Sequence, residues 1–379
     1  MEQKIITPDG NYAALDKWIS DNGIKRLMLV CGGSFRFLPG ISEKIDIIRS
    51  GKTTVIRFSD FKPNPSYESV VAGVELFRKK KCDGIIAIGG GSAIDVAKCI
   101  KLFSNMESDG KYGEFLKTEI VPNEIPFLAM PTTAGTGSEA TRYAVIYYEG
   151  KKQSVTSESC IPHSVLMDPG VLVTLPLYQK KATMMDAFCH AIESFWSVNS
   201  TSESKEYSKE AIGGILANME GFLSNDEAGN AGMLMAAYVA GKAINITQTT
   251  AGHAMCYKIT GLFYVSHGHA AALCNRALFP WMLDHTDRCN DPRGEEYLKK
   301  TFDELGRAMG CSCGRDGAEK LDNIIRKLEF FVPTANEEQF AELRTGVNPD
   351  RLKNNPVVLD ENAINELYHT ILNHSEMLK

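Results

Sequence analysis

Hydrophobic and polar positions follow two different patterns along the chain. In the first half, short apolar runs end at Gly, Pro or Asp and alternate with stretches of helical spacing, such as 67–81 and 92–105. The apolar runs are "RLMLVCGG" (26–33), "TTVIRF" (53–58), "GIIAIGGG" (84–91) and "PFLAMPTT" (126–133). Alternating strands and helices predict βαβ units and a parallel sheet covered on both faces. Such sheets bind ligands at the carboxyl ends of their strands.

After about residue 178 the strand pattern gives way to apolar residues at three- and four-residue spacing. This spacing is found in residues 180–198, 204–223, 231–245 and 362–378. The second half is therefore predicted to be all-helical. The short join "DPGVLVTLP" (168–176) predicts an α/β domain over 1–175 and a helical domain over 176–379, packed tightly across a cleft.

The overall composition narrows the function classes. The 379 residues carry a net charge of −6 and no basic block, which argues against nucleic acid as the main partner. No apolar run approaches the roughly 18 residues of a membrane helix, and the N-terminus lacks a signal-peptide pattern. The ten cysteines include no C-x-x-C pair, which favours reduced thiols and a cytoplasmic protein.

Three glycines follow a predicted strand in "GIIAIGGGSAIDVAK" (84–98). Glycines let a phosphate approach the backbone, and the start of the next helix offers unpaired N–H groups. The stretch is not the G-x-G-x-x-G fingerprint. The alternative is a plain strand–turn–helix connection in which Ser92 and Asp95 form a capping box, and the sequence leaves both interpretations open.

A second loop, "PTTAGTGSEAT" (131–141), follows the next predicted strand and is rich in hydroxyl groups. It suits a polar ligand such as a ribose, an amide or a phosphate, although ordinary loops have similar compositions. Together with the glycine loop, it is predicted to form the second wall of a nucleotide site.

Asp186 and His190 are four residues apart in the helical stretch "MMDAFCHAIESFWS" (184–197), so they share one helix face. His253 lies on another apolar helical segment, and His267 follows in the predicted turn "VSHGHA". One carboxylate and three imidazoles suit a borderline divalent ion such as Fe²⁺ or Zn²⁺. The alternatives are a surface ion pair and hydrogen-bonded core histidines.

Four motifs resemble, in order and spacing, the iron-containing (group III) alcohol dehydrogenases: "GGGSAIDVAK", "PTTAGTGSEAT", "DAFCHAIES" and "GHAMCYKITGLFYVSHGHA". The resemblance implies the dehydroquinate synthase-like architecture, with a dinucleotide-binding α/β domain and an all-α metal-binding domain. It implies that Asp186, His190, His253 and His267 bind Fe²⁺, with Zn²⁺ as the other candidate. His269 lies outside this ligand set and is expected to bond to the backbone or to a neighbouring group.

The resemblance also implies a coenzyme site. It implies that the pyrophosphate lies on Gly90, Gly91 and Ser92. It implies that nicotinamide and phosphate contacts come from Thr132, Thr133, Thr136 and Thr141. Asp95 is expected to be a structural or nicotinamide-side neighbour, and Lys152 a loop lysine near the coenzyme.

The chain departs from the commonest family pattern at two places. Tyr257 stands where many relatives carry a histidine with a proton-relay role. A catalytic role is therefore expected for Tyr257, with a water molecule or the ribose hydroxyl as the alternatives. NAD-preferring relatives often have an acidic residue after the first of the predicted strands, where this chain has Gly32, Gly33 and Ser34. The coenzyme is therefore expected to be NADP or NAD, with NADP favoured.

The implied activity is a metal-dependent, NAD(P)H-linked alcohol dehydrogenase or aldehyde reductase acting on a small molecule, as a homodimer. The stretches "FWSVNSTSES" (195–204), "AGKAINITQTTAGHA" and "YKIT" resemble a phosphonoacetaldehyde-reductase branch. Arg142, Lys242 and Lys258 are the candidates for contacting an anionic group on that substrate. The alternative, which each of them taken alone favours, is a solvated surface charge.

Two other functions remain open from the sequence. One is a dehydroquinate-synthase-type lyase that uses NAD and zinc, although its ligand set includes a Glu and lacks the Asp-x-x-x-His helix pattern. The other is a non-catalytic nucleotide-binding protein, against which a complete set of metal ligands argues.

Overall fold

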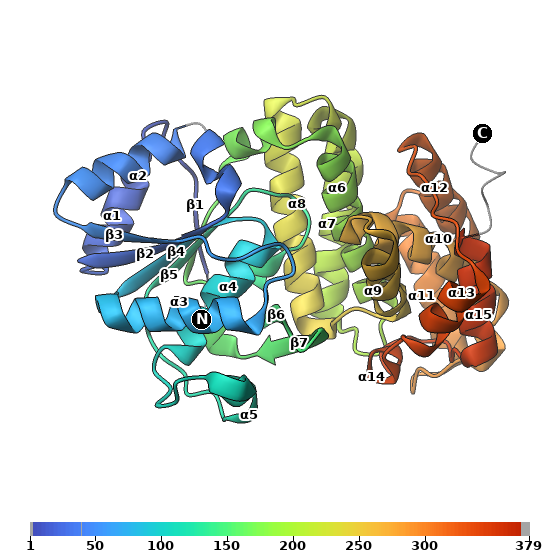
Figure 1. Cartoon of the computed structure of the whole chain (residues 1–379). Helices are drawn as coiled ribbons and strands as arrows, with labels where there is room; N and C mark the ends of the chain where they lie inside the picture. The colour runs from blue at the N-terminus through green and yellow to red at the C-terminus, as the bar shows by residue number, and fades with distance from the viewer. Residues whose placement is uncertain (1–2, 39, 373–379) are drawn as a thin grey trace. The chain divides into compact units, whose positions relative to one another are not determined.

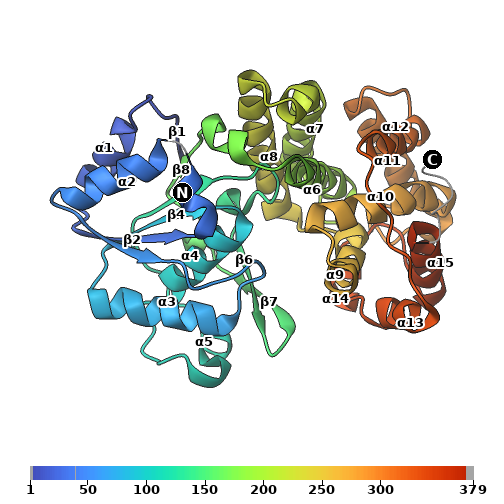
Figure 2. The same ribbon diagram turned by 45° about the horizontal axis from the view of Figure 1, so that its top comes forward.

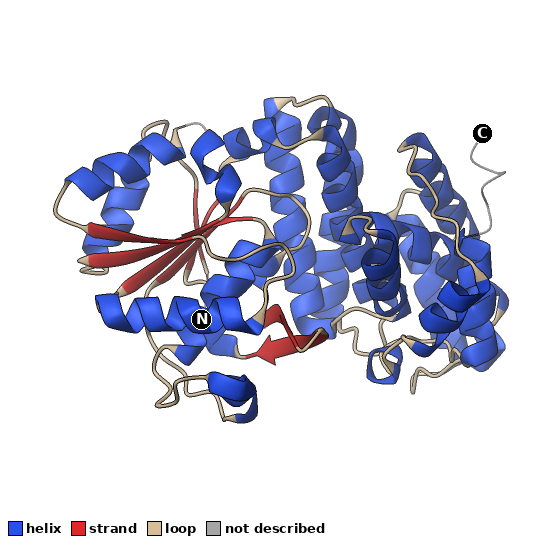
Figure 3. Ribbon diagram, viewed as in Figure 1, coloured by secondary structure: helices blue, strands red, loops and turns tan. Residues whose placement is uncertain are grey.

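The computed structural model describes residues 3–38 and 40–372. The chain divides into two compact units, Met1–Leu175 and Pro176–Lys379. Figure 3 shows that the β-strands belong to the first unit and that the second is built of helices. The predicted fold class, a parallel α/β part followed by an all-helical part, is confirmed.

The first unit contains a six-stranded sheet with the order β1-β8-β5-β4-β2-β3, in which all neighbouring strands are parallel. Its strands are β1 (Lys4–Ile6), β2 (Arg26–Cys31), β3 (Thr54–Phe58), β4 (Gly84–Gly89), β5 (Phe127–Pro131) and β8 (Ser164–Leu166). The four predicted strands are β2 to β5. A separate antiparallel hairpin joins β6 (Tyr143–Tyr148) to β7 (Lys151–Thr156).

Helices cover both faces of this sheet, as Figure 1 shows. They are α1 (Ala13–Asp21), α2 (Ile41–Ser50), α3 (Tyr67–Lys80) and α4 (Gly91–Phe103), and the short α5 (Glu114–Lys117) follows them. Alternate strand residues point to opposite faces. Leu27 and Leu29 join the core under α1 and α2, whereas Met28 and Val30 join the core under α3 and α4. The sheet is therefore buried on both sides, as the apolar runs predict.

The carboxyl ends of β4 and β5 lie next to each other. The two strands pair in register with Ile88 opposite Met130 and Gly89 opposite Pro131. The loops that leave these strands, the glycine loop and the 131–141 loop, therefore start side by side at the edge where parallel sheets bind ligands.

The second unit has no β-strand among its described residues. Its helices are α6 (Leu177–Trp196), α7 (Ser202–Leu223), α8 (Glu227–Thr247), α9 (Ala251–Phe263), α10 (His267–Asp284), α11 (Glu295–Ala308), α12 (Gly314–Lys327), α13 (Glu337–Thr345), α14 (Pro349–Leu352) and α15 (Glu361–Leu372). Figure 2 shows α6, α7 and α8 packed together. In the described part of the chain, no helix combines the length and the apolar character that a membrane span requires.

Two details of the helical half differ from the sequence prediction. The predicted turn at His267 is wrong, because Ser266 is the N-cap and His267 is the first residue of α10. The predicted helix over 362–378 is observed as α15 as far as Leu372, and its remainder lies outside the described residues.

The helices α7 and α8 approach each other closely at a pair of glycines. A Cβ added to Gly229 on α8 would lie 2.3 Å from the carbonyl carbon of Gly221 on α7. Backbone atoms cannot move aside as a flexible side chain can, so this crossing requires glycine. In contrast, a Cβ added to the exposed Gly213 on α7 would meet nothing within 4 Å.

We expect Gly229→Ala to lower the free energy of unfolding by about 1–3 kcal/mol, because the added methyl group overpacks the helix crossing. The matched control, Gly213→Ala, is expected to raise it by about 0.5–1 kcal/mol through the higher helix propensity of alanine. Urea denaturation followed by circular dichroism measures both values. Equal effects of the two substitutions would contradict the close packing of α7 and α8.

Candidate metal centre and nucleotide site

Three helices of the second unit build the candidate metal centre. Asp186 and His190 lie one turn apart on α6, His253 lies on α9, and His267 begins α10. The Nε2 atoms of the histidines approach one oxygen, Asp186 Oδ1, at 3.4 Å from His253 and 3.9 Å from both His190 and His267. The four predicted ligands are therefore brought to one place.

This arrangement fits a small divalent cation. One ligand atom from each of Asp186, His253 and His267 lies within 4.8 Å of the other two. Two ligands that bind one ion at about 2.0–2.2 Å lie at most about 4.4 Å apart, so the three groups need little adjustment. A carboxylate oxygen with imidazole nitrogens suits Fe²⁺ or Zn²⁺. The role of His190 as a fourth ligand stays a prediction; its ring stacks on that of His253, with centroids 4.5 Å apart.

The charges around the centre favour a bound cation. Asp186 and His253 are buried. Burial raises the pKa of the Asp186 carboxyl, but His190, His267 and His253 outweigh it and hold this pKa well below its usual range. Burial lowers the pKa of His253, but Glu193 and Asp186 reverse the effect and raise it to about 9. A divalent ion that binds here would take the place of a proton.

Tyr257 lies beside a predicted ligand. Its ring stacks on that of His267, with centroids 5.2 Å and planes 15° apart. Burial raises the pKa of the Tyr257 hydroxyl, so this hydroxyl keeps its proton at ordinary pH. The position agrees with the expected catalytic role of Tyr257, which stays a prediction.

Two residues that the sequence analysis did not single out support the centre. The fully buried Glu193 lies on α6, and its Oε1 is 2.5 Å from His253 Nδ1. Glu193 follows Asp186 by seven residues, so the helical period that pairs Asp186 with His190 could have found it. A Cβ on Gly268 would lie 2.0 Å from the carbonyl oxygen of Ala182 on α6, so glycine at this position lets α10 begin so close to α6.

His269 is held by other partners, which confirms the expected bond to the backbone. Its Nε2 lies 2.9 Å from the carbonyl oxygen of Phe331, and its Nδ1 lies 3.1 Å from the hydroxyl of Tyr178. Burial lowers the pKa of His269 to about 4. Its neutral ring donates from Nε2 and accepts at Nδ1.

In the first unit, the two predicted loops pack against each other. A Cβ on Gly90 would lie 3.2 Å from the side chain of Thr133, and one on Gly91 would lie 3.0 Å from that of Thr136. Thr132 N donates to Gly89 O at 3.0 Å. The glycines thus let the two loops form one surface at the N-terminus of α4, where N–H groups and the helix dipole favour a phosphate.

The capping-box interpretation of Ser92 and Asp95 is wrong. The N-cap of α4 is Gly90, without a side-chain cap, and the helix already begins at Gly91. Asp95 instead accepts hydrogen bonds from Ser138 Oγ at 2.6 Å and Val145 N at 3.0 Å. Asp95 therefore holds the 131–141 loop onto α4, which agrees with the structural one of its two expected roles.

Two other predicted coenzyme residues lie in unexpected settings. Thr141 is buried, and Lys98 Nζ lies 3.2 Å from its hydroxyl and 2.6 Å from its carbonyl oxygen, so it is tied into the core. Lys152, expected in a loop, lies on β7 opposite Tyr147. The loop placement of Lys152 is therefore wrong, whereas the coenzyme contacts of both residues stay predictions.

An arginine that the sequence analysis did not identify, Arg57, lies beside the turn after β2. Gly32 is followed by the exposed Gly33 and Ser34, which begin a 3₁₀ helix. Arg57 on β3 reaches this turn: its Nη2 lies 3.4 Å from Gly32 O and its Nε lies 2.8 Å from Ser59 Oγ. A guanidinium therefore lies beside the turn in which NAD-preferring relatives often have an acidic residue.

The three predicted substrate cations have contacts of their own. Arg142 pairs with Glu158 at 2.7 Å in the first unit. In the second unit Lys258 pairs with Glu342 at 3.2 Å, and Lys242 lies 4.0 Å above the ring of Tyr207. These contacts leave their role in substrate binding as a prediction.

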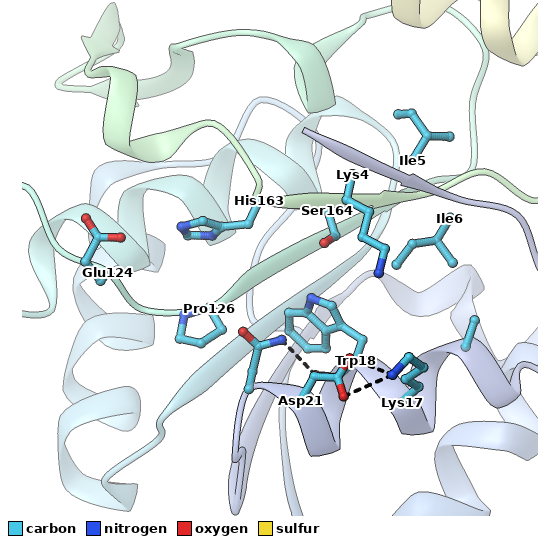
Figure 4. A pocket seen from close by; sticks show the side chains of 12 residues that line it. Lys4, Ile5, Ile6, Lys17, Trp18, Asp21, Glu124, Pro126, His163 and Ser164 are labelled. Carbon is cyan, nitrogen blue, oxygen red and sulfur yellow. Dashed lines mark hydrogen bonds and ion pairs between the residues drawn. The ribbon is translucent and has the colours of Figure 1, made fainter. Parts of the chain in front are cut away.

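A cavity of about 430 Å³ lies at the amino ends of β1, β5 and β8 in the first unit (Figure 4). It is lined by residues that begin or precede strands, such as Lys4, Pro126 and Ser164, and by Trp18 of α1. None of the predicted site residues lines it. It is therefore distinct from the coenzyme loops at the carboxyl ends of β4 and β5.

Comparison with known families matches almost the whole chain. Residues 2–169 match the iron-containing alcohol dehydrogenase family, and residues 180–372 match the C-terminal part of the Fe-containing alcohol dehydrogenase family. The chain belongs to the iron-containing alcohol dehydrogenases. This membership gives no support to the dehydroquinate-synthase-type lyase or to a non-catalytic nucleotide-binding protein.

Individual members of this family share about a quarter to a third of their residues with the chain. The chain is 30 % identical over 271 residues to the probable alcohol dehydrogenase EutG of Escherichia coli, covering 70 % of this chain and 65 % of that protein. It is 25 % identical over 351 residues to the NADPH-dependent butanol dehydrogenase of Clostridium saccharobutylicum, covering 91 % and 86 % of the two chains.

Among solved structures, the chain is similar to sulfoacetaldehyde reductase from Bifidobacterium kashiwanohense in complex with NAD⁺. The TM-score is 0.85 at 24 % identity, and the match covers 98 % of this chain and 97 % of that one. At this identity the likeness establishes the fold.

We expect His253→Ala to lose most of the bound metal, because it removes a buried nitrogen ligand next to Asp186. His269→Gln is expected to keep its metal content close to that of the wild type, because this ring bonds to Phe331 and Tyr178. Elemental analysis of both reconstituted variants provides the measurement. Stoichiometric metal in His253→Ala, or its loss in His269→Gln, would mean that the ligand set is wrong.

Proposed function

We propose that this chain is a metal-dependent, NAD(P)H-linked alcohol dehydrogenase or aldehyde reductase that acts on a small molecule. The observation that carries the proposal is the convergence of three imidazoles on the buried carboxylate of Asp186, in a chain of the iron-containing alcohol dehydrogenase family. In the reductive direction an aldehyde, NAD(P)H and a proton give an alcohol and NAD(P)⁺.

The two units are proposed to divide the chemistry. A bound Fe²⁺ or Zn²⁺ would supply Lewis-acid chemistry toward a carbonyl group, and a bound nicotinamide would supply the hydride. Asp186, His190, His253 and His267 hold the cation in the second unit. In the first unit the N-terminus of α4 and its glycines bind the pyrophosphate, and the threonine loop orients the coenzyme.

Tyr257 is proposed to donate the hydrogen bond that many relatives obtain from a histidine. Its hydroxyl keeps its proton because burial raises the pKa. Its stacking on His267 fixes the ring beside the cluster. The group therefore supplies a proton or a hydrogen bond to the oxygen atom on which negative charge develops.

The substrate is proposed to be a small aldehyde that carries an anionic group, with phosphonoacetaldehyde as the first candidate. One support is the resemblance to the phosphonoacetaldehyde-reductase branch. Another is the guanidinium of Arg351 on α14, which lies 5.3 Å from the ring centroid of Tyr257. A third is the activity of the structural relative, a sulfoacetaldehyde reductase, since sulfoacetaldehyde also joins a short aldehyde to an anion.

A substrate panel tests this activity. We expect the Fe²⁺- or Zn²⁺-reconstituted protein to oxidise NAD(P)H with short aldehydes, and to have a higher kcat/KM for phosphonoacetaldehyde and sulfoacetaldehyde than for the uncharged propionaldehyde. Absorbance at 340 nm follows the reaction. If no aldehyde causes oxidation of NAD(P)H with either metal, the proposed reaction is wrong. Equal kcat/KM values for charged and uncharged aldehydes would contradict only the proposal of an anionic substrate. The implied homodimer stays a prediction that analytical ultracentrifugation tests.

The coenzyme is proposed to be NADPH in preference to NADH. A carboxylate after β2 would repel a 2′-phosphate, and this chain has Gly32 there. A Cβ added to Gly32 meets nothing within 4 Å, and the cationic Arg57 lies beside the turn. Open space and a guanidinium both favour an additional phosphate. The alternative is that an acidic residue elsewhere, such as the exposed Asp60 after β3, binds the ribose.

We expect Gly32→Asp to raise the KM for NADPH ten- to hundredfold and to shift the preference to NADH, because like charges at a partly buried site repel by about 1–3 kcal/mol. The backbone at Gly32 is extended, with φ −78°, so aspartate fits without strain. Arg57→Ala is expected to weaken the binding of NADPH more than the binding of NADH. A wild-type preference for NADH, with an unchanged coenzyme ratio in both variants, would show that this turn does not select the coenzyme.

A further inference from the structure

A second buried carboxylate lies behind the candidate metal centre. Glu193 projects from the same helix as Asp186 and is completely buried. Its Oε1 lies 2.5 Å from Nδ1 of His253 and accepts a hydrogen bond from Asn275 Nδ2 at 2.7 Å. On the other side of the His253 ring, Nε2 faces Asp186. Glu193 therefore contacts Nδ1 of this imidazole, while Asp186 faces Nε2.

The second oxygen of Glu193 receives the start of α9. Oε2 accepts hydrogen bonds from Thr250 N at 2.6 Å, from Thr250 Oγ1 at 2.8 Å and from His253 N at 3.3 Å. The positive end of the helix dipole adds to this attraction. A Cβ on Gly252 would lie 2.6 Å from Oε1, so the close approach depends on glycine. The three groups that contact Oε2 are all donors, as an ionised carboxylate requires.

We propose that Glu193 is a positioning residue that fixes His253 with its proton on Nδ1 and thereby strengthens divalent-cation binding at the Asp186, His190, His253 and His267 cluster. The inference rests on the metal site of the proposed function. A carboxylate that accepts from Nδ1–H leaves the Nε2 lone pair to face the cation and makes the imidazole more basic. Removal of such a partner typically weakens metal binding about 10- to 100-fold.

The substitution Glu193→Gln tests this role sharply because the amide has one acceptor oxygen instead of two. At the Oε2 position two backbone N–H groups, of Thr250 and His253, can only donate. The amide oxygen is therefore expected to take that position and its NH₂ group to face His253 Nδ1. The ring would then accept at Nδ1 and carry its proton on Nε2, where it blocks the cation.

A buried carboxylate away from the cluster provides the matched control. Asp291 is 5 % exposed and accepts from Arg293 N at 2.9 Å, from Arg293 Nε at 2.8 Å and from Arg293 Nη2 at 2.6 Å. Asp291→Asn removes the same charge from the same unit. A loss of metal affinity caused only by general destabilisation would appear in this variant too.

The measurement is the affinity of the metal-free full chain for Zn²⁺, determined by competition with a chromogenic chelator. We expect a 10- to 100-fold higher Kd in Glu193→Gln and a Kd within twofold of wild type in Asp291→Asn. An unchanged Kd in Glu193→Gln, or an equal rise in both variants, would overturn the inference and leave the proposed function standing. A wild-type chain that binds neither Zn²⁺ nor Fe²⁺ would overturn both.

A second measurement needs no variant. In the Zn²⁺-loaded wild-type protein, ¹⁵N–¹H correlation spectra of the histidine rings report which nitrogen carries the proton. We expect His253 to have its proton on Nδ1 and none on Nε2. A proton on Nε2 would overturn the proposal even if Glu193→Gln failed to fold.

Discussion

The second unit depends on the compensation of two carboxylates buried on one face of α6. A charge removed from water is costly unless opposite charges or hydrogen-bond donors meet it. Three imidazoles surround the carboxylate of Asp186. Glu193 accepts hydrogen bonds from the N-terminus of α9 and contacts one of these imidazoles, that of His253. The starts of α9 and α10 are therefore placed by α6, and Gly252 and Gly268 provide the space for this approach.

The first unit builds its site differently, from backbone rather than from charged side chains. Glycines at the end of β4 let the threonine loop after β5 pack against the start of α4, and Asp95 holds that loop through Ser138 and Val145. The resulting surface offers N–H groups, which suit a phosphate. A neutral backbone site and a charged cluster correspond to the two tasks of the family, holding a dinucleotide and holding a cation.

Within this common plan, a few positions distinguish the chain. Tyr257 stacks on His267, at a position where many relatives carry a histidine. In the turn after β2, NAD-preferring relatives often have an acidic residue. This chain has open space at Gly32 and the positive charge of Arg57 beside it. Gly32 lies in a turn and the side chain of Arg57 is exposed, so neither residue belongs to the hydrophobic core.

The sequence by itself determined the local features. Apolar runs that end at Gly, Pro or Asp predicted β2 to β5, and the helical period placed Asp186 and His190 on one face. The motifs, through their family resemblance, pointed to the histidines of α9 and α10. The three-residue strands β1 and β8 are too short to leave a pattern, and they form because the sheet offers them a neighbour.

Tertiary structure alone decided which of these faces meet. Glu193 and His253 are 60 residues apart, and Arg57 and Gly32 are 25 apart, so no local spacing joins them. The capping box at Ser92, one of two interpretations that the sequence left open, does not form because Gly90 is the N-cap and α4 begins at Gly91. Periodicity fixes the side of an element on which a residue lies, whereas its partner depends on packing between segments distant in the chain.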